Sequence, residues 1–237
     1  METEVTEQFF RENAYQKQCS ANVIASKENV IVLDKTVFYP LGGGQPGDTG
    51  KIEWPGGIAT VVDTRYGEDG MINHLIDGQG QIPAQGTTVT AHIDWERRYK
   101  HMRMHTALHL LGSILQYGVT GGNISAKKSR LDFDMEDTVD KESVNNQLSK
   151  LVAANHQVTC RWISDEELHS QPELVRTMSV QPPKGAGNIR LLEIEGVDLQ
   201  PCGGTHVRST AEVGNVRVGK VEKKGRRNRR VSILLDQ

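Results

Sequence analysis

Two pairs of metal-ligating side chains, far apart in the sequence, constrain the fold of this chain more than any other feature. His105 and His109 are four residues apart, which places both imidazoles on one face of a helix. Cys202 and His206 are separated by two glycines and a threonine, so a tight turn can aim both side chains at one point. Imidazole and thiolate are ligands that Zn²⁺ prefers, whereas Mg²⁺ and Ca²⁺ prefer oxygen. The sequence therefore predicts a zinc site that joins a helix to a distant turn.

The remaining histidines are weaker candidates for metal ligands. His101 lies one further helical turn before His105, and we expect it to contact solvent or the ligands rather than the metal. His74, His92 and His169 have no neighbour at ligand spacing. We expect these three in the core or on the surface, without a metal.

Length and composition favour a globular protein of two modest domains. The chain has 237 residues, of which 36% are hydrophobic and 24% charged. No apolar run approaches the roughly 20 residues that a membrane span needs, and the acidic N-terminus lacks the features of a signal peptide. Only three cysteines are present, one of them assigned to the metal, so a disulfide framework is not expected. We expect a cytoplasmic protein without a membrane partner; a monomer is favoured, although the sequence does not determine the oligomeric state.

Residues 1–93 are predicted to form the first domain, built from strands and turns. Its candidate strands are short, rich in β-branched residues and separated by glycine-containing turns. They are residues 19–26, 29–34, 58–64, 71–76 and 87–93. A small antiparallel barrel or sandwich is the fold that such strands favour.

A glycine-rich segment, residues 35–50, interrupts these strands. Gly42, Gly43, Gly44, Gly47 and Gly50 require a backbone that turns tightly or approaches another chain closely. The segment lacks the Gly-Lys-Ser/Thr ending of a phosphate loop, and no helical pattern follows it. It is either a barrel turn or a functional loop whose polar contact is Gln45.

Residues 94–237 are predicted to form a second domain of the α+β class. Asp94 is a good N-cap for a helix that carries the histidine pair and ends at Gly118, and Asp140 caps a second helix. The other elements are strands and a C-terminal hairpin. The strands are residues 124–134, 157–163 and 189–195. Helices combined with an antiparallel sheet define the class.

Basic residues gather near the C-terminus, although the net charge of the chain is only −2. Between Val207 and Arg230, only Glu212 and Glu222 oppose the basic side chains. These are Arg208, Arg217, Lys220, Lys223, Lys224, Arg226, Arg227, Arg229 and Arg230. Such a surplus indicates a surface that meets phosphate, and the alternative is a solvated run of charges.

The ligand set alone does not determine whether the zinc is structural or catalytic. Four protein ligands are typical of a structural site, whereas a catalytic site keeps a position for water or substrate. A zinc peptidase is excluded because Thr106 follows His105, where the His-Glu-x-x-His motif would place its general base.

The motifs resemble a known family. His105-Thr-Ala-Leu-His109 with Cys202-Gly-Gly-Thr-His206 resembles the zinc site of the editing domain of alanyl-tRNA synthetases and of the free-standing AlaX-type editing proteins. The glycine-rich segment 38–50 and the basic hairpin are similar to further parts of that family. The resemblance implies an N-terminal β-barrel and an α+β editing domain that acts on tRNA(Ala) wrongly charged with serine, and also with glycine.

The resemblance also implies roles for particular residues. Zinc is held by His105, His109, Cys202 and His206, and no catalytic residue beyond the zinc site is identified. This sequence departs from the family's pattern at Leu108 and Ala126, so a glutamine that binds the substrate in the family is missing. Ser125, Thr106 or Gln45 is expected to replace it. The full set of substrate-binding candidates is Gly43, Gly44, Gln45, Thr106 and Ser125. The tRNA phosphates are expected at Lys127, Lys128, Arg226, Arg227, Arg229 and Arg230.

Two hypotheses follow. The first is a zinc-dependent aminoacyl-tRNA deacylase that edits in trans. The second is a tRNA-binding module with a structural zinc and no esterase activity.

Overall fold

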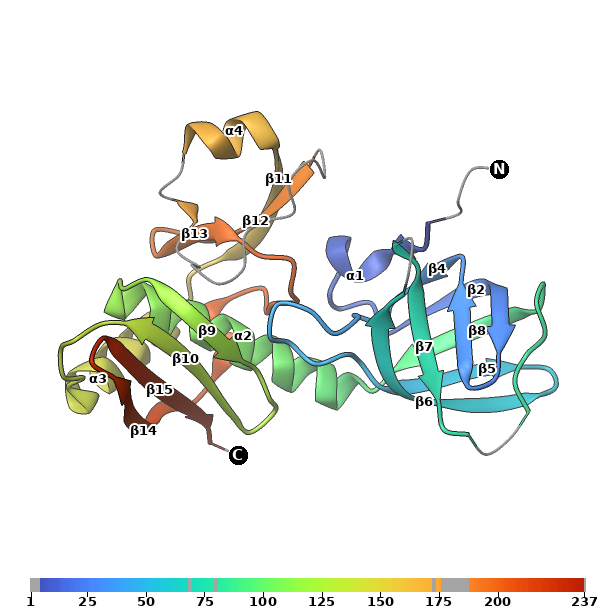
Figure 1. Ribbon diagram of the computed structural model, residues 1–237, viewed down its shortest axis with the longest axis horizontal. Helices are drawn as coiled ribbons and strands as arrows, with labels where there is room; N and C mark the ends of the chain where they lie inside the picture. Colours follow the sequence, from blue (N-terminus) through green and yellow to red (C-terminus); the bar gives the residue numbers. More distant parts are fainter. Residues whose placement is uncertain (1–4, 68–69, 79–80, 172–173, 176–187, 237) are drawn as a thin grey trace. The chain divides into compact units, whose positions relative to one another are not determined.

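The computed structural model describes residues 5–67, 70–78, 81–171, 174–175 and 188–236. The chain divides into two compact units, Met1–Tyr99 and Lys100–Gln237. Helix α2 (Trp95–Leu115) begins in the first unit and continues in the second, so the domain boundary after residue 93 stays a prediction. The first unit contains a closed barrel and the second combines helices with antiparallel sheets, which confirms the α+β class (Figure 1). None of the helices among the described residues combines the length and apolar character that a membrane span requires.

Six strands close the barrel of the first unit in the order β2-β3-β7-β6-β5-β8. Their bounds are β2 Gln18–Lys27, β3 Val30–Leu33, β5 Gly50–Trp54, β6 Gly57–Tyr66, β7 Ile72–Ile76 and β8 Thr88–Ile93. Alternate residues point inward: on β2, Cys19, Ala21 and Val23 are buried while their neighbours are exposed. Five of the six strands were predicted. The sixth, β5, was missed because it follows the glycine-rich segment directly.

Short elements flank the barrel. Strand β1 (Glu7–Gln8) pairs in parallel with β4 (Lys35–Thr36), and α1 is the single turn Phe9–Glu12. Phe10 of α1 is buried against Tyr39, with the two rings edge to face and their centroids 5.3 Å apart. This contact covers the segment that leads into the glycines.

Several glycines of this segment are required by the backbone geometry of the barrel. Gly43 and Gly44 adopt positive φ angles of 56° and 82° in a turn closed by backbone hydrogen bonds between Gly42 and Gln45. In β5, a Cβ added to Gly50 would lie 2.1 Å from the carbonyl oxygen of His92 on the neighbouring strand. The segment is therefore a barrel turn, and a functional role for it stays a prediction.

A four-stranded antiparallel sheet, ordered β14-β15-β10-β9, forms one layer of the second unit. Its strands are β9 Val119–Asn123, β10 Lys128–Asp134, β14 Val216–Gly225 and β15 Asn228–Leu235. Helix α3 (Lys141–Ala153) packs on β14, and its Asn145 accepts a hydrogen bond from the backbone N–H of Val218 at 2.7 Å. The predicted Asp140 cap is confirmed, because its carboxylate accepts from the N–H groups of Glu142 and Ser143.

A separate three-stranded sheet, ordered β11-β12-β13, carries the short helix α4 (Asp165–Ser170) (Figure 1). Its strands are β11 Val158–Ser164, β12 Asn188–Ile194 and β13 Asp198–Pro201. The sheet has its own small core of Ile163, Leu168, Leu174, Ile189 and Leu191. A 3-10 turn, Thr210–Val213, follows the sheet and contacts α3.

Two predicted elements are shorter in the structure, and two strands of the second unit were missed. Helix α2 ends at Leu115 rather than Gly118, because Gln116 already adopts a φ of 53°. The predicted strand 124–134 is shorter, starting at Lys128, and β9 before it was missed because two of its five residues are glycine. Strand β13 was also missed, and it, rather than β12, leads directly to Cys202.

Candidate metal centre

Helix α2 presents the first two ligands of the cluster. Asp94 caps its start as predicted, accepting a hydrogen bond from the N–H of Arg97 at 3.1 Å. Met104, Leu108 and Leu111 recur at helical spacing and are buried. His105 and His109 lie one turn apart on another stripe of the same helix and are each only 8% exposed.

The other two ligands lie in the segment that follows β13. Arg190 of β12 holds this segment, donating from Nη1 to the carbonyl oxygens of Cys202 and Gly204, both at 2.9 Å. The N–H of Cys202 donates to the carbonyl of Arg190 at 3.0 Å. These bonds fix the backbone between Cys202 and His206, so the sequence Cys-Gly-Gly-Thr-His has a defined shape.

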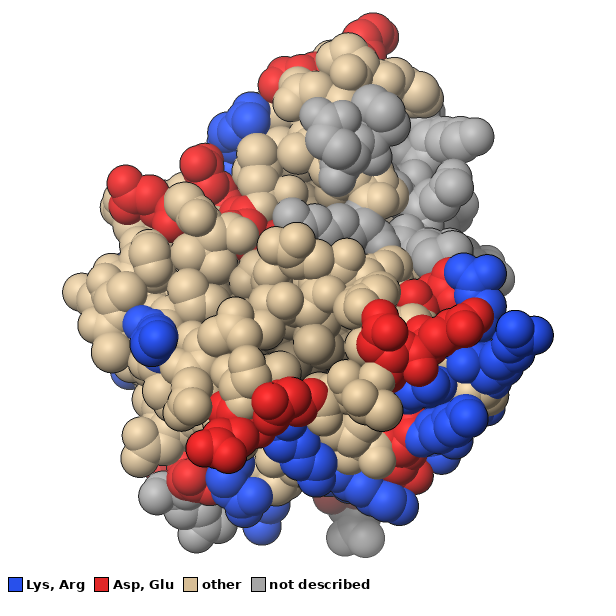
Figure 2. Space-filling view, turned by 90° about the vertical axis from the view of Figure 1, so that its left-hand side faces the viewer, with Lys and Arg blue, Asp and Glu red and all other residues tan. Residues whose placement is uncertain are grey.

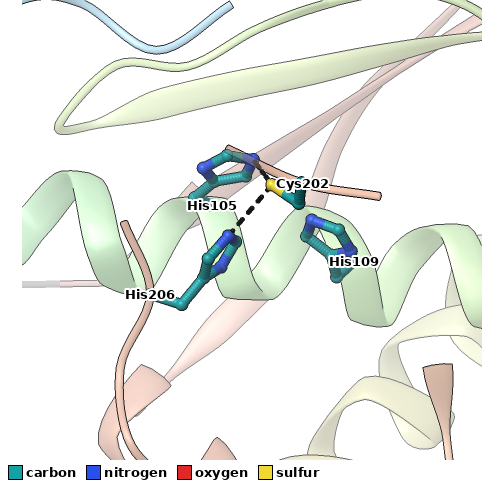
Figure 3. A group of neighbouring side chains, drawn as sticks. All are labelled: His105, His109, Cys202 and His206. Atoms are coloured by element: carbon teal, nitrogen blue, oxygen red, sulfur yellow. Dashed lines mark hydrogen bonds between the residues drawn. The ribbon is translucent and has the colours of Figure 1, made fainter. Parts of the chain in front are cut away.

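The four side chains converge on one point (Figure 3). One possible ligand atom from each of His105, His109, Cys202 and His206 lies within 4.8 Å of the others. The Cys202 Sγ is 3.6 Å from Nε2 of His105 and 3.2 Å from Nε2 of His206. The histidines are buried and Cys202 is half-buried. Two segments whose ligands His105 and Cys202 are 97 residues apart therefore form a single group of three nitrogens and one sulfur that can hold a metal ion.

Neighbouring polar groups contact the ligands on the side away from the cluster. Nδ1 of His109 lies 2.8 Å from Oδ2 of Asp198. Nδ1 of His206 lies 3.2 Å from Oγ1 of Thr106, which also accepts a hydrogen bond from the N–H of Val207 at 3.4 Å. Both contacts leave the Nε2 atoms directed at the cluster, which is the arrangement found around metal-ligating histidines.

The electrostatics of the group favour a thiolate. Burial raises the pKa of Cys202, but the charges of His105 and His206 outweigh it and hold that pKa well below its ordinary value. Burial lowers the pKa of His206, and the charge of His105 lowers it further. Burial also lowers the pKa of His109, but the hydrogen bond that the ring donates to Asp198 and the contact with Cys202 outweigh it and raise that pKa to about 10. Because the thiolate is the form of cysteine that binds metals, the donor set fits an ion.

The predicted substrate-binding residues lie in different settings. Gly43, Gly44 and the fully buried Gln45 belong to the first unit, whereas the cluster belongs to the second. Thr106 is beside the cluster, but its Oγ1 is engaged with His206 and Val207. The Ser125 hydroxyl donates to the carbonyl of Lys128 at 2.6 Å in the turn before β10. Their roles toward a substrate stay predictions.

The predicted tRNA contacts divide into exposed side chains and side chains held within the sheet. Lys127, Lys128, Arg226 and Arg227 are exposed. Arg229, in contrast, is 8% exposed and donates to backbone carbonyls that include those of Gly225 and Asp137. Arg230 forms a two-pronged ion pair with Asp132, both contacts at 2.8 Å. Arg229 therefore shapes the turn of the hairpin.

Acidic side chains are interleaved with the basic ones. On the face drawn in Figure 2, Asp and Glu side chains lie among the Lys and Arg side chains rather than apart from them. In the hairpin, Glu222 pairs with Lys220 and Lys224, and Asp134 pairs with Arg227. The local surplus predicted from the sequence is thus partly neutralised by neighbours.

Sequence reasoning missed Asp198, Gln200 and Arg190. A signal for the first two was present, because Asp198, Gln200 and Cys202 alternate and so share one face of an extended segment. That signal could be used only once the residues before Cys202 were known to form a strand. Arg190 carried no local signal, since its acceptors are backbone carbonyls twelve and fourteen residues away.

Comparison with known proteins agrees with this architecture. The profile of the family described as tRNA synthetases class II (A) matches residues 2–97, and that of the threonyl and alanyl tRNA synthetase second additional domain matches residues 189–232. Alanyl-tRNA editing protein AlaX-M of Methanosarcina mazei is 36% identical over 98% of this chain and 98% of its own length. The AlaX-M of Saccharolobus solfataricus is 34% identical over 96% and 98%, respectively. AlaX-L of Pyrococcus horikoshii is 34% identical, and the match spans 56% of that longer protein.

Fold and cluster thus define the class: proteins that carry an antiparallel barrel and the second additional domain of threonyl- and alanyl-tRNA synthetases. Within that class, the chain belongs to the family of alanyl-tRNA editing proteins. The resemblance seen in its motifs is confirmed.

Proposed function

We propose that this protein is a zinc-dependent deacylase that hydrolyses tRNA(Ala) mischarged with serine, and also with glycine, in the cytoplasm. The observation that carries the proposal is the convergence of His105, His109, Cys202 and His206 in a chain of the alanyl-tRNA editing family. Hydrolysis of the wrong ester before it reaches the ribosome would protect the fidelity of translation.

Zinc fits the donor set. In a tetrahedral site with Zn–S of about 2.3 Å and Zn–N of about 2.0 Å, sulfur and nitrogen ligands lie about 3.5 Å apart. Sγ of Cys202 lies at 3.6 Å and 3.2 Å from the two nearest imidazole nitrogens. Three imidazoles and one thiolate are also the ligand types that suit Zn²⁺ and not Mg²⁺ or Ca²⁺.

An aminoacyl ester is an activated substrate, so modest assistance suffices. A bound zinc ion supplies Lewis acidity, which polarises the ester carbonyl or lowers the pKa of water toward about 7. The protein's own contribution is to hold the ligands: Thr106 faces His206 and Asp198 faces His109. Four protein ligands fill a tetrahedral shell, so substrate must approach where the shell can open. Cys202 is the most exposed ligand and lies outside the regular elements, just after β13, which favours its side of the site.

Discrimination against alanine has a simple physical basis. A pocket that hydrogen-bonds the serine hydroxyl rejects an analogue that lacks the hydroxyl far better than one that only measures size. Ser125, Thr106 and Gln45 are the proposed sources of this contact. Of these, Thr106 lies beside His206 in the cluster.

The tRNA would be held through its phosphates by Lys127, Lys128, Arg226 and Arg227, whose side chains are exposed. Arg226 and Arg227 lie at the tip of the hairpin between β14 and β15, whereas Lys127 precedes β10 and Lys128 is its first residue. Strands β10 and β15 pair antiparallel, with Lys128 opposite Leu234 and Asp134 opposite Asn228, so the two groups lie at opposite ends of one sheet. Arg229 and Arg230 are proposed to support this surface and not to contact phosphate themselves.

The competing function is a tRNA-binding module whose zinc only stabilises the fold. Cys202→Ala distinguishes the two, with Cys160→Ala, another free cysteine on the exposed part of β11, as the matched control. A deacylase should lose zinc and hydrolysis in the Cys202 variant while the far-ultraviolet spectrum and tRNA binding persist. If fold and tRNA binding are lost together, or if wild-type protein with full zinc content hydrolyses no ester, the binding-module function is favoured.

A further inference from the structure

A buried polar triangle lies behind one ligand of the cluster. Oδ2 of Asp198 is 2.8 Å from Nδ1 of His109 and 2.6 Å from Nε2 of Gln200, and this Nε2 is 3.0 Å from the same Nδ1. Asp198 is 5% exposed and Gln200 is half-buried. Both residues lie on β13, with Cys202 two residues further along the chain.

The triangle determines which nitrogen of His109 carries the proton. A carboxylate oxygen only accepts hydrogen bonds, so Nδ1 must donate to Asp198. If Nδ1 were unprotonated, its lone pair would face the carboxylate at hydrogen-bond distance, which is repulsive. The amide of Gln200 also donates to Oδ2, because an amide oxygen there would face the carboxylate in the same way. When the ring is neutral, as metal binding requires, the lone pair of His109 is therefore at Nε2, on the side of the ring away from Asp198.

We propose that Asp198, held in place by Gln200, is the positioning residue of the metal centre: it fixes the tautomer and ring orientation of His109 for metal binding. The inference rests on the proposed metal binding by the four ligands. The negative charge of Asp198 also makes the imidazole a stronger donor to the ion, and such outer partners typically contribute 10–100-fold to metal affinity. Gln200 acts through Asp198 and contributes less.

The test is the affinity of the purified full chain for zinc alone, measured by competition with a chromogenic chelator. Asp198→Asn keeps the shape of the side chain and removes its charge, and Gln200→Ala removes only the support. Glu195→Ala, on an exposed residue of the same β12–β13 hairpin, is the matched control for loss of one carboxylate. We expect zinc affinity to fall at least 10-fold in Asp198→Asn, to fall less in Gln200→Ala, and to stay at the wild-type value in Glu195→Ala.

The inference would be overturned if Asp198→Asn bound zinc as tightly as Glu195→Ala does. Circular dichroism of the zinc-free variants shows whether each is folded. If Asp198→Asn is unfolded, the zinc affinity of Gln200→Ala is the deciding measurement. A wild-type zinc affinity in Gln200→Ala would then also overturn the inference. The zinc-affinity measurement uses no tRNA, so its outcome does not depend on whether the protein is a deacylase. Wild-type protein that binds zinc and hydrolyses no ester contradicts the function and leaves the role of Asp198 intact.

Discussion

Asp48 and Arg98, fifty residues apart, form an ion pair in which both side chains are almost fully buried. Nε of Arg98 donates to both carboxylate oxygens, at 3.1 Å and 2.9 Å, and Nη2 donates to Oδ2 and, at 2.7 Å, to the carbonyl of Val37. Asp48 also accepts from the N–H of Tyr39 at 2.7 Å. The pair ties the glycine-rich segment of the barrel to the first turns of α2.

Asp48→Asn should destabilise the protein strongly, because it leaves the buried Arg98 guanidinium without a counter-charge. Losing one partner of a buried pair typically costs about 3–5 kcal/mol of unfolding free energy. Urea denaturation measures the change. Arg65→Ala, which breaks the exposed Arg65–Asp63 pair, is the control, and we expect a change below about 1 kcal/mol. Similar losses in the two variants would contradict the assigned importance of the buried pair.

His74 should make the stability of the barrel depend on pH. Its Nδ1–H donates to the carbonyl of Ile31 at 3.0 Å, its Nε2 lies 2.8 Å from Oγ1 of Thr36, and burial lowers its pKa to about 4. The ring is therefore neutral when folded, whereas the unfolded chain takes up a proton near pH 6.5, so stability falls as pH drops from about 6.5 toward 4.

For His74 alone, the loss between pH 7 and pH 5 should be about 2 kcal/mol. Urea unfolding of wild type and of His74→Phe at both pH values isolates this contribution, because all other groups are shared. A steeper dependence in wild type is expected, and the His74 ring resonances should not titrate above pH 5. Titration near pH 6.5 in the folded protein would contradict the assignment.

Thr106→Val should weaken the metal centre without changing the volume of the side chain. The substitution removes the acceptor for Nδ1 of His206 and for the N–H of Val207. Leaving these donors unsatisfied should cost about 1–3 kcal/mol of unfolding free energy. Thermal unfolding with and without added zinc measures the loss. Thr106→Ser keeps the hydroxyl and should show little of this loss; equal losses in the two variants would contradict a role specific to the hydroxyl.

Arg226→Ala with Arg227→Ala should make tRNA binding less sensitive to salt. Each lost phosphate contact reduces the magnitude of the slope of log affinity against log salt by about 1. In the double variant, this magnitude should therefore fall by up to about 2. Arg217→Ala, an exposed arginine paired with Asp236, is the control. Arg229 and Arg230 are left intact because Arg229 supports the turn and Arg230 pairs with Asp132. An unchanged slope would remove the hairpin tip from the tRNA interface.

Local patterns in the sequence predicted much of the fold. Helix caps at Asp94 and Asp140 use side chains adjacent to the helix they begin, so the chemistry of a short segment was enough. Short runs rich in β-branched residues between turn signals likewise indicated strands such as β2 and β8. The pairing of His105 and His109 with Cys202 and His206 was predictable because ligand type and spacing are themselves local signals.

The missed features depend on partners far away in the sequence. Strand β9 contains Gly121 and Gly122, which have low β propensity, and exists because it pairs with β10. The Asp48–Arg98 pair and the contact of Asp198 with His109 span fifty and eighty-nine residues. No pattern within one segment reports such contacts. Arg229 carried a misleading signal, since a basic residue in a basic run is ordinarily exposed but here binds carbonyls of its own turn.

The proposed deacylase activity can be measured directly as the hydrolysis of Ser-tRNA(Ala) and Ala-tRNA(Ala), side by side, by purified protein of measured zinc content. We predict rapid loss of the seryl ester, little loss of the alanyl ester, and no seryl activity in Cys202→Ala. Survival of both esters at full zinc occupancy, or equal hydrolysis of both, would contradict the account.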